Sequence, residues 1–321
     1  MILVTGGAGF IGSNLVHALC RRGAGVTVVD DLQDGRKFSN IVDADIARYV
    51  DMEDFYSRLE RDASALDGVQ AVFHQGACSD TTQWDGRYMM RVNYEYSARL
   101  LAACQARGIA LIYASSAAVY GTGRRFEETR ACERPANLYG YSKQLFDSLV
   151  LRDAADRGVQ VAGLRYFNVY GPREEHKGRM ASVALHLHRQ IEQGGEARLF
   201  QGTHGYGDGE QRRDFVHVDD VVAVNLWLLD NPQVRGIFNV GTGRSRSFND
   251  VARAVLDWHG RGSIRYIPFP DDLRGRYQPF TEADLGALRR AGYAGGFLDV
   301  APGVERYLDW LRDEEQRGSN A

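Results

Sequence analysis

The glycine-rich segment near the start of the chain constrains the fold more than any other feature. Thr5–Gly12 (TGGAGFIG) lies between an apolar run typical of a buried strand and a segment with helical spacing of apolar residues. Its glycines allow a tight turn, the close approach of a pyrophosphate and close packing of helix on strand. The free N–H groups at the helix start can then bind phosphate. The segment predicts a dinucleotide-binding unit, with contacts from Gly6, Gly9 and Gly12.

The order of strands and helices indicates the fold class. Apolar strands alternate with amphipathic helices in the first half of the chain, which is typical of parallel strands covered by helices on both faces. We therefore predict an α/β fold with a Rossmann-type doubly wound parallel sheet and a smaller C-terminal substrate lobe. The expected strands are residues 2–5, 26–30, 69–74, 109–114 and 159–166. The expected helices are residues 11–22, 88–106 and 139–152.

Beyond Asn168 this alternation becomes less regular. We place the NAD(P)-binding domain at residues 1–167, with strands near 214–241 returning to it, and the substrate lobe mainly at 168–321. The strands expected to return in or beside the main sheet are residues 215–218 and 237–240. Further helices are expected near residues 181–193, 281–291 and 301–311.

Charge and cysteine spacing argue against several classes of protein. The formal net charge is −3 and no block of Lys or Arg is present, so we expect no nucleic-acid partner. No apolar run reaches membrane-spanning length, and Met1 is not followed by a secretory leader, so we expect no membrane partner and a cytoplasmic location. The cysteines are widely spaced and no His/Cys cluster has metal-ligand spacing. We therefore expect free thiols and no metal.

The end of the second expected strand carries the group that should bind the cofactor ribose. Asp30 lies there, followed by Asp31, and a carboxylate at this position accepts hydrogen bonds from ribose hydroxyls, which favours NAD. Arg36 and Lys37 come just beyond and could pair with a 2′-phosphate, which favours NADP. Because the two signs of charge compete, both cofactors stay open at this point.

Tyr139 and Lys143 form the expected proton-transfer pair. They lie four residues apart on an expected helix and so share one face. A phenol titrates at about 10 in water, and a nearby ammonium together with a cationic nicotinamide would lower its pKa. Ser116 follows an expected strand and can hydrogen-bond a substrate oxygen as it changes between carbonyl and alkoxide. Tyr141 is the rival for the catalytic role, but its spacing from Lys143 places it on another face.

These features together resemble the extended short-chain dehydrogenase/reductase family over essentially the whole chain. The later segments resemble the epimerases of this family that act on ADP-heptose to supply the lipopolysaccharide core. A small insertion, residues 204–211, lies beside the expected nucleotide loop. The segments that carry the resemblance are residues 76–86 (GACSDTTQWDG), 165–178 (RYFNVYGPREEHKG), 213–216 (RDFV), 266–270 (YIPFP) and 274–278 (RGRYQ).

The resemblance implies the site residues. Tyr139 and Lys177 would be the two acid/base residues, assisted by Ser116 and Lys143. NADP is the expected cofactor, while Asp31 and Met52 depart from the family pattern and leave NAD open. The cofactor-binding residues would be Gly6, Gly9, Phe10, Ile11, Gly12, Asp30, Asp31, Lys37, Gln75, Gly76, Ala77, Cys78, Ser79, Asn93, Lys143, Val169 and Lys177. The substrate-binding residues would be Asn168, Arg179, His186, Phe200, Gln201, Gly202, Thr203, Arg213 and Tyr277.

The expected activity is epimerisation of ADP-D-glycero-D-manno-heptose at C6, through transient oxidation to a ketone and return of the hydride. The cofactor would supply hydride transfer, while protein groups move protons and orient the sugar. A 4,6-dehydratase is disfavoured because Ala117 and Ala118, rather than an acidic pair, follow Ser116. The alternatives are a UDP-hexose 4-epimerase and, less favoured, a non-catalytic NADP-sensing regulator. The resemblance also implies a homo-oligomer, with a pentamer as the expected form.

Overall fold

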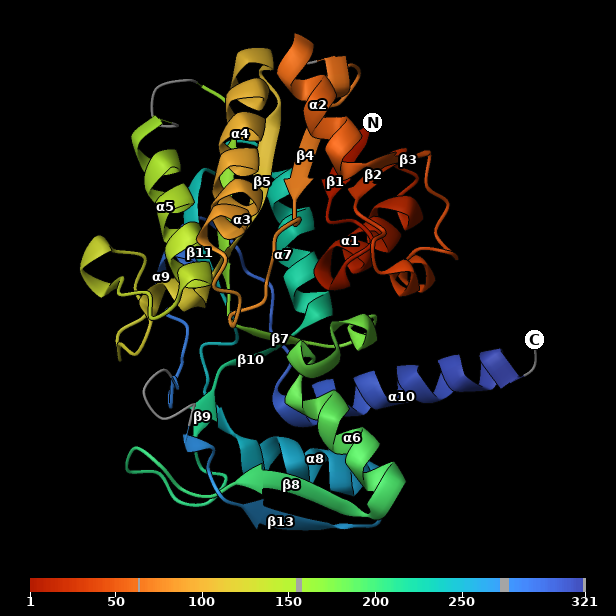
Figure 1. The fold of residues 1–321 in the computed structure, drawn as a ribbon, viewed down its shortest axis with the longest axis vertical. Helices are drawn as coiled ribbons and strands as arrows, with labels where there is room; N and C mark the ends of the chain where they lie inside the picture. Colours follow the sequence, from red (N-terminus) through yellow and green to blue (C-terminus); the bar gives the residue numbers. More distant parts are fainter. Residues whose placement is uncertain (63, 154–157, 272–276, 320–321) are drawn as a thin grey trace.

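The computed structural model describes residues 1–62, 64–153, 158–271 and 277–319 (Figure 1). Seven parallel strands form one sheet in the order β11-β6-β5-β4-β1-β2-β3. This order reverses between β1 and β4, as in a doubly wound Rossmann-type sheet, so the predicted fold class is confirmed. The strands are β1 (Ile2–Thr5), β2 (Val26–Asp30), β3 (Arg48–Asp51), β4 (Ala71–His74), β5 (Ala110–Ser116), β6 (Val161–Tyr166) and β11 (Gly236–Val240).

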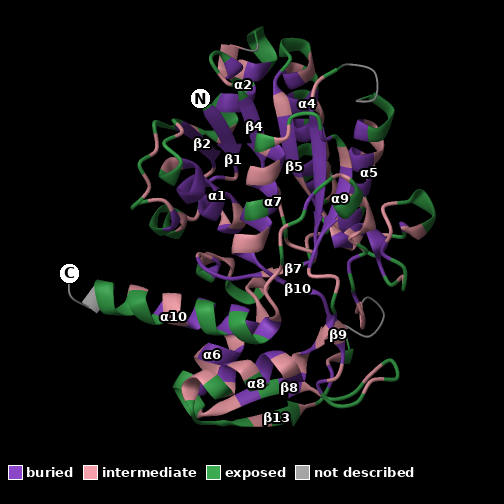
Figure 2. Ribbon diagram, turned by 180° about the vertical axis from the view of Figure 1, so that it is seen from behind, coloured by how far each residue is buried: buried purple, intermediate pink, exposed green. Residues whose placement is uncertain are grey.

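Helices cover both faces of this sheet, and Figure 2 shows its strands buried between them. Because side chains alternate along a strand, Leu3 of β1 packs into one core and Val4 into the other. The core that contains Val4 is covered by α1 (Phe10–Arg21) and α7 (Val218–Asp230). The core that contains Leu3 is covered by α2 (Met52–Asp62), α4 (Tyr96–Arg107) and α5 (Leu138–Asp153). Burial on both faces explains why these strands read as continuous apolar runs.

The C-terminal lobe has a core of its own below the sheet in Figure 1. Leu185, Leu199, Val255 and Leu308 contribute buried side chains to this core from four different elements. The elements of the lobe are α6 (Val183–Gly194), β8 (Glu196–Phe200), α8 (Phe248–His259), β13 (Ser263–Ile267) and α10 (Val300–Ser319). Two short strand pairs lie between the lobe and the sheet, namely β7 (Asn168–Tyr170) with β10 (Phe215–His217), and β9 (Arg212–Arg213) with β12 (Arg246–Ser247). Across the described residues, no helix has the length and apolarity needed to cross a membrane.

The expected helix at residues 88–106 is interrupted. It consists of α3 (Gly86–Met90), a π-helical turn η3 (Arg91–Glu95) and α4. The expected helix at 281–291 is wrong over most of its length, because only α9 (Gly286–Arg290) is helical. Thr281 and Ala283 instead donate backbone N–H groups to the Arg212 carbonyl and to Oδ2 of Asp214. Their backbone therefore follows the β9 region rather than closing helical turns.

The two strands expected to return after residue 214 have different positions. β11 joins the main sheet beside β6, whereas β10 pairs with β7 outside that sheet and ends at His217. β11 and α7 thus bring later parts of the chain to the sheet and its covering layer. The domain boundary at residue 167 stays a prediction.

Candidate functional site

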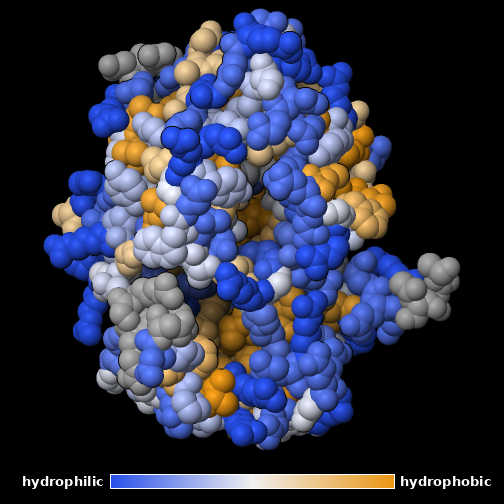
Figure 3. Space-filling model, in the orientation of Figure 1, coloured by the Kyte–Doolittle hydropathy of each residue, from blue (hydrophilic) through white to orange (hydrophobic). Residues whose placement is uncertain are grey.

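A cleft of about 620 Å³ lies at the carboxyl ends of β1, β4 and β5. Thr5, His74 and Ser116 line it from the three strand ends, where ligands bind in doubly wound sheets. Figure 3 shows a hollow with apolar side chains in its depth between the sheet and the C-terminal lobe. Sixteen of the seventeen residues expected to bind the cofactor line this cleft, namely Gly6, Gly9, Phe10, Ile11, Gly12, Asp30, Asp31, Lys37, Gln75, Gly76, Ala77, Cys78, Ser79, Lys143, Val169 and Lys177.

The glycine loop has the shape that a dinucleotide pyrophosphate needs. Gly6 has φ +64°, and a Cβ there would lie 2.6 Å from the Gly76 backbone. A Cβ on Gly12 would lie 2.0 Å from the carbonyl oxygen of Gly6. α1 begins at Phe10 with Gly9 as its N-cap, without a side-chain cap and without an acidic residue in its first turn. Its first N–H groups and the positive end of its dipole therefore face the cleft and fit a phosphate group.

The carboxylates at the end of β2 share one lysine. The Nζ of Lys37 lies 2.6 Å from Oδ1 of Asp30 and 2.8 Å from Oδ1 of Asp31. Asp30 also accepts a hydrogen bond from the Ala8 amide at 2.7 Å, which ties it to the glycine loop. Burial raises the pKa of the Asp30 carboxyl, while Lys37 opposes that shift. Arg36 instead pairs with exposed Asp34 and does not line the cleft, so Lys37 is the one of the two expected cations that reaches it.

Asn93 lies behind the wall of the cleft rather than in it. From the π-helical turn, its Oδ1 accepts from the Cys78 amide at 2.8 Å and its Nδ2 donates to the Cys78 carbonyl at 3.0 Å. The Nδ2 of Asn93 also donates to the hydroxyl of Ser142 on α5 at 3.1 Å. Asn93 therefore supports the loop of residues 75–79 and links it to α5.

Tyr139, Lys143 and Ser116 come together at the end of β5. All three residues line the cleft, and the Nζ of Lys143 lies 6.0 Å from the Tyr139 ring centroid. Lys143 donates to the Ala114 carbonyl at 2.8 Å. Burial raises the pKa of Tyr139, an effect that the neighbouring Ser116 hydroxyl opposes. Burial lowers the pKa of Lys143 to about 8. The expected lowering of the Tyr139 pKa by Lys143 is therefore not seen with the protein groups alone.

The rival Tyr141 is 46% exposed and lies outside the cleft. This orientation agrees with the helical spacing, because Tyr141 is half a turn from the face that carries Lys143.

Lys177 enters the cleft from the opposite wall. It lies in the turn η6 (Glu175–Met180), with its Nζ 5.2 Å from the ring centroid of Phe10. Burial lowers the pKa of Lys177, and the nearby Glu174 carboxylate opposes the shift. Arg179 donates to Oγ1 of Thr82 at 2.7 Å, which joins this turn to the loop across the cleft. Two groups able to exchange protons, Tyr139 and Lys177, thus line one cleft.

A second cavity of about 250 Å³ adjoins the first on the side of the C-terminal lobe. Lys177 and Val169 line both cavities, and Asn168 lines the second. Its other walls are mostly apolar side chains of the lobe, such as Phe215, Phe248 and Val304.

Arg213 on β9 is buried, with 6% of its surface exposed. Its guanidinium lies 4.9 Å from the ring centroid of Tyr277 and 5.7 Å from that of Phe248, and it donates to the Arg212 carbonyl at 3.0 Å. No carboxylate pairs with it among the described residues. Burial lowers its pKa, as expected for a cation held away from water. A buried guanidinium of this kind suits an incoming anion.

The remaining residues expected to bind substrate are spread more widely. Arg179 lines the cleft, and His186 lies half-buried on α6. Phe200 meets Phe269, which in turn meets Tyr277. The residues not among those lining the two cavities are His186, Phe200, Gln201, Gly202, Thr203, Arg213 and Tyr277. Arg274, Gly275 and Arg276, which carried part of the resemblance, lie outside the described residues.

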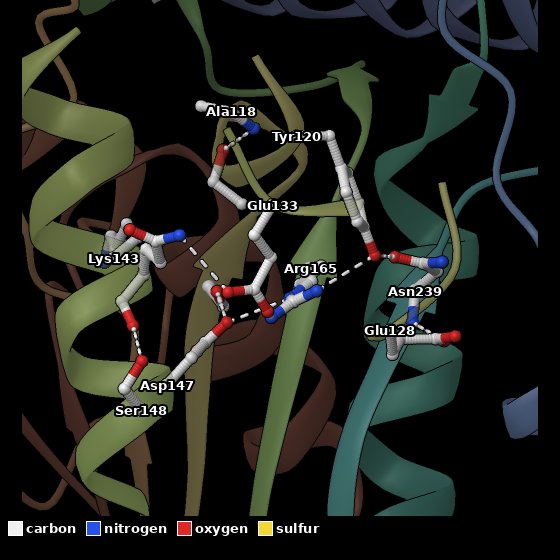
Figure 4. Close-up of polar contacts among 12 residues, drawn as sticks. Ala118, Tyr120, Glu128, Glu133, Lys143, Asp147, Ser148, Arg165 and Asn239 are labelled. Atoms are coloured by element: carbon white, nitrogen blue, oxygen red, sulfur yellow. Dashed lines mark hydrogen bonds and ion pairs between the residues drawn. The ribbon is translucent and has the colours of Figure 1, made fainter. Parts of the chain in front are cut away.

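A buried polar cluster behind the cleft was missed from the sequence. Arg165 on β6 lies between Asp147 and Glu133 on one side and Tyr120 on the other, as Figure 4 shows. The available signal was the spacing of α5, because Asp147 continues the four-residue repeat that Tyr139 and Lys143 begin.

Comparisons with known proteins agree with this geometry. The chain matches the NAD dependent epimerase/dehydratase family over residues 2–241. It is 59% identical, over 98% of both chains, to the ADP-L-glycero-D-manno-heptose-6-epimerase of Alkalilimnicola ehrlichii. The crystal structure of ADP-L-glycero-D-manno-heptose-6-epimerase from Helicobacter pylori matches with a TM-score of 0.83 and 31% identity, over 97% of this chain and 96% of that one. The UDP-glucose 4-epimerase of Thermus thermophilus in complex with NAD matches with a TM-score of 0.80 and 29% identity, over 97% and 98%.

Proposed function

The chain belongs to the NAD dependent epimerase/dehydratase family, and we propose that it converts ADP-D-glycero-D-manno-heptose to ADP-L-glycero-D-manno-heptose by epimerisation at C6. The observation that carries this proposal is the presence of Tyr139 and Lys177 in one cleft beside the glycine loop, in a chain 59% identical to a heptose epimerase over 98% of its length. A nicotinamide bound in this cleft supplies the acceptance and return of hydride.

The protein groups then manage protons and orientation. Tyr139 exchanges a proton with the C6 oxygen, while Ser116, which lines the same cleft, holds that oxygen in place. Lys143 stays anchored on the Ala114 carbonyl and keeps its ammonium beside the ring of Tyr139. Lys177, whose pKa is lowered by burial, serves as the second acid/base group from the opposite wall. Two such groups suit an epimerase, because the ketone presents each of its faces in turn.

Arg213 is proposed as the partner of the ADP diphosphate. Its burial without a carboxylate among the described residues supports this role, and Tyr277 and Phe200 lie in the aromatic cluster beside it. Asn168 in the second cavity, next to Lys177, is proposed to contact the sugar.

We propose NADP as the cofactor, with Lys37 as the cation that meets the 2′-phosphate at the cleft. The Asp30 and Asp31 carboxylates beside Lys37 are the observation that favours NAD instead. Native mass spectrometry of the purified protein would report the mass of the retained cofactor. NADP is expected, and retained NAD would contradict this part of the proposal. The same spectrum would count subunits, for which we propose a homo-oligomer of five chains.

A substrate assay tests the proposed activity. ADP-D-glycero-D-manno-heptose should be epimerised and UDP-galactose should not, and the reverse preference would favour a UDP-hexose 4-epimerase. No turnover of either substrate by cofactor-loaded protein would favour the non-catalytic regulator.

Lys177→Met tests the second proton-transfer group. The substitution keeps most of the side-chain volume but removes the amine, so kcat should fall roughly 10²–10⁴-fold while the cofactor stays bound. A wild-type kcat would reduce the mechanism to a single acid/base group, Tyr139.

A further inference from the structure

We infer that Asp147 is a positioning residue that holds helix α5 on the end of strand β5, so that Tyr139 and Lys143 are presented to Ser116. This inference rests on the proposed function, because it assigns a role in the chemistry of that same cleft. Asp147 does not line the cleft, and it acts through the residues that do.

The helix and the strand are joined by hydrogen bonds at two successive residues of β5, and Tyr139 lies beside the third. Lys143 donates to the Ala114 carbonyl at 2.8 Å, and Asp147 accepts from the Ser115 hydroxyl at 2.8 Å. Tyr139 and the next strand residue, Ser116, both line the cleft. The three helix residues are spaced by four and so lie on one face of α5. The contact deepest in the protein is that of Asp147, whose side chain is 1% exposed. Asp147 therefore anchors the row whose outer end is the reacting hydroxyl.

Asp147 has enough partners to act as a rigid anchor. Its Oδ1 accepts from the Tyr113 hydroxyl at 2.9 Å, and its Oδ2 accepts from Nε of Arg165 at 2.9 Å as well as from Ser115. Arg165 also donates to Glu133 and to the Tyr120 hydroxyl (Figure 4). The anchor thus joins α5 to β5, β6 and the turn η4 (Ala117–Tyr120) that directly follows Ser116.

The charges around this anchor give it a second effect. Asp147 faces Lys143 on its own helix, Tyr113 on β5, Arg165 on β6 and, across Arg165, Glu133. Burial lowers the pKa of Lys143 to about 8, and the negative charge of Asp147 opposes that lowering. Lys143 is faced in addition by Cys78 and His74. Neutralising Asp147 should therefore lower the pKa of Lys143 further.

The sharpest test compares two carboxylates that bind the same guanidinium. Asp147→Asn and Glu133→Gln each leave Arg165 with one carboxylate, but only Asp147 touches β5 beside Ser116. A displacement of about 1 Å can cost roughly 10²-fold in rate, so Asp147→Asn should lower kcat by about that factor with KM unchanged. Glu133→Gln should destabilise the protein yet leave kcat close to the wild-type value.

A second readout does not depend on turnover. In protein with ¹³C-labelled lysine, the Lys143 ε-carbon should titrate at lower pH in Asp147→Asn than in the wild type, and at the wild-type pH in Glu133→Gln. A Lys143 titration that does not move in Asp147→Asn, or equal losses of kcat in the two variants, would overturn the inference. If the wild type proves to lack epimerase activity, the proposed function fails, whereas this titration still reports on Asp147.

Ser115→Ala covers the case in which Asp147→Asn does not fold. It removes one bond of the anchor but keeps the carboxylate charge. The expected result is a smaller loss of kcat with an unchanged Lys143 titration, and an unchanged kcat would count against positioning by Asp147.

Discussion

Two buried arginines, one behind the end of the sheet and one on the side of the C-terminal lobe, have opposite surroundings. Arg165 is 1% exposed and has two carboxylates and a tyrosine hydroxyl as partners. Arg213 is 6% exposed and rests on two aromatic rings, with no carboxylate among the described residues. A buried charge is costly unless it is paired, so the two sites differ in what completes them. Arg165 is completed by the protein itself, whereas Arg213 has no anionic partner among the described residues.

This difference suggests a division of work. The sheet side is a rigid, internally satisfied frame that positions the groups proposed to do the chemistry. The lobe side holds an unpaired cation, which the proposed function assigns to the substrate diphosphate. Substitutions on the sheet side should therefore change turnover or stability, and substitutions on the lobe side should change affinity.

The largest effect is expected at the outer end of the sheet-side frame. Tyr139→Phe removes the exchangeable proton but little volume, so kcat should fall roughly 10²–10⁴-fold, with KM and the bound cofactor retained. Steady-state assays with native mass spectrometry measure both quantities. Tyr141→Phe is the matched control, since Tyr141 is exposed on the same helix and its loss should leave kcat unchanged. Similar losses in both variants would show that the helix rather than the hydroxyl was affected.

Removing the paired arginine should cost stability. Arg165→Met leaves Asp147 buried without its cation and leaves Glu133 with only the exposed Arg130, so the free energy of unfolding should fall by roughly 3–5 kcal/mol. Urea unfolding followed by circular dichroism measures this change. A loss below about 1 kcal/mol, the range of an exposed ion pair, would contradict the view that this frame is tightly coupled.

Removing the unpaired arginine should have the opposite outcome. Arg213→Met keeps the contacts with Tyr277 and Phe248 but removes the charge, so the stability should stay the same or rise. The binding of ADP should weaken by about 1.5–3 kcal/mol, the range of a hydrogen bond to a charged group. Calorimetric titration with ADP tests this directly, and unchanged ADP affinity would remove Arg213 from the proposed diphosphate site.

The smallest effect concerns protonation on the sheet side. His74 is buried between the Thr5 and Ser97 hydroxyls, at 2.6 Å and 2.8 Å, and burial lowers its pKa to about 3. The folded-state pKa of His74 lies below the unfolded value of about 6.5, so the unfolded chain binds a proton first as the pH falls. The free energy of unfolding is therefore unaffected by His74 above that pH and decreases as the pH falls toward 3.

At pH 5 this group should account for a loss of roughly 1–2 kcal/mol relative to pH 7.5. Unfolding measured at both pH values should show that His74→Gln, which cannot titrate, loses less than the wild type. Equal losses would show that other groups set the acid sensitivity.

The sheet and its glycine loop could be predicted because their signals are local. The strand Ile2–Thr5 and the segment Thr5–Gly12 carry their own periodicity and turn chemistry, and the structure has them where expected. β3, β8, α2 and α8 were not predicted, since the exposed residues of β3 and the polar face of α2 hide the pattern of a buried element. The expected helix at 281–291 was wrong because hydrogen bonds to Arg212 and Asp214, distant in sequence, decide that backbone.

Only part of the candidate site could be predicted from the sequence. Tyr139 and Lys143 share a helix, so their spacing reveals their contact. The same spacing places Asp147 on their face of the helix, but it does not indicate that Asp147 contacts Arg165 and Ser115, which lie on two other elements. The same is true of Lys37, whose two carboxylate partners became evident only once the chain was folded.

The π-helical turn at Arg91–Glu95 limits how the sequence of this chain can change in evolution. A regular α-helix turns by about 100° per residue. A turn that contains one extra residue therefore changes the direction in which all later side chains of the helix point. Deleting one residue here would give a smoother helix but rotate Asn93 away from Cys78, and the loop beside it would lose both of its backbone supports. Lineages of this protein should therefore keep the length of the turn, and Asn93 within it, more strictly than its other residues.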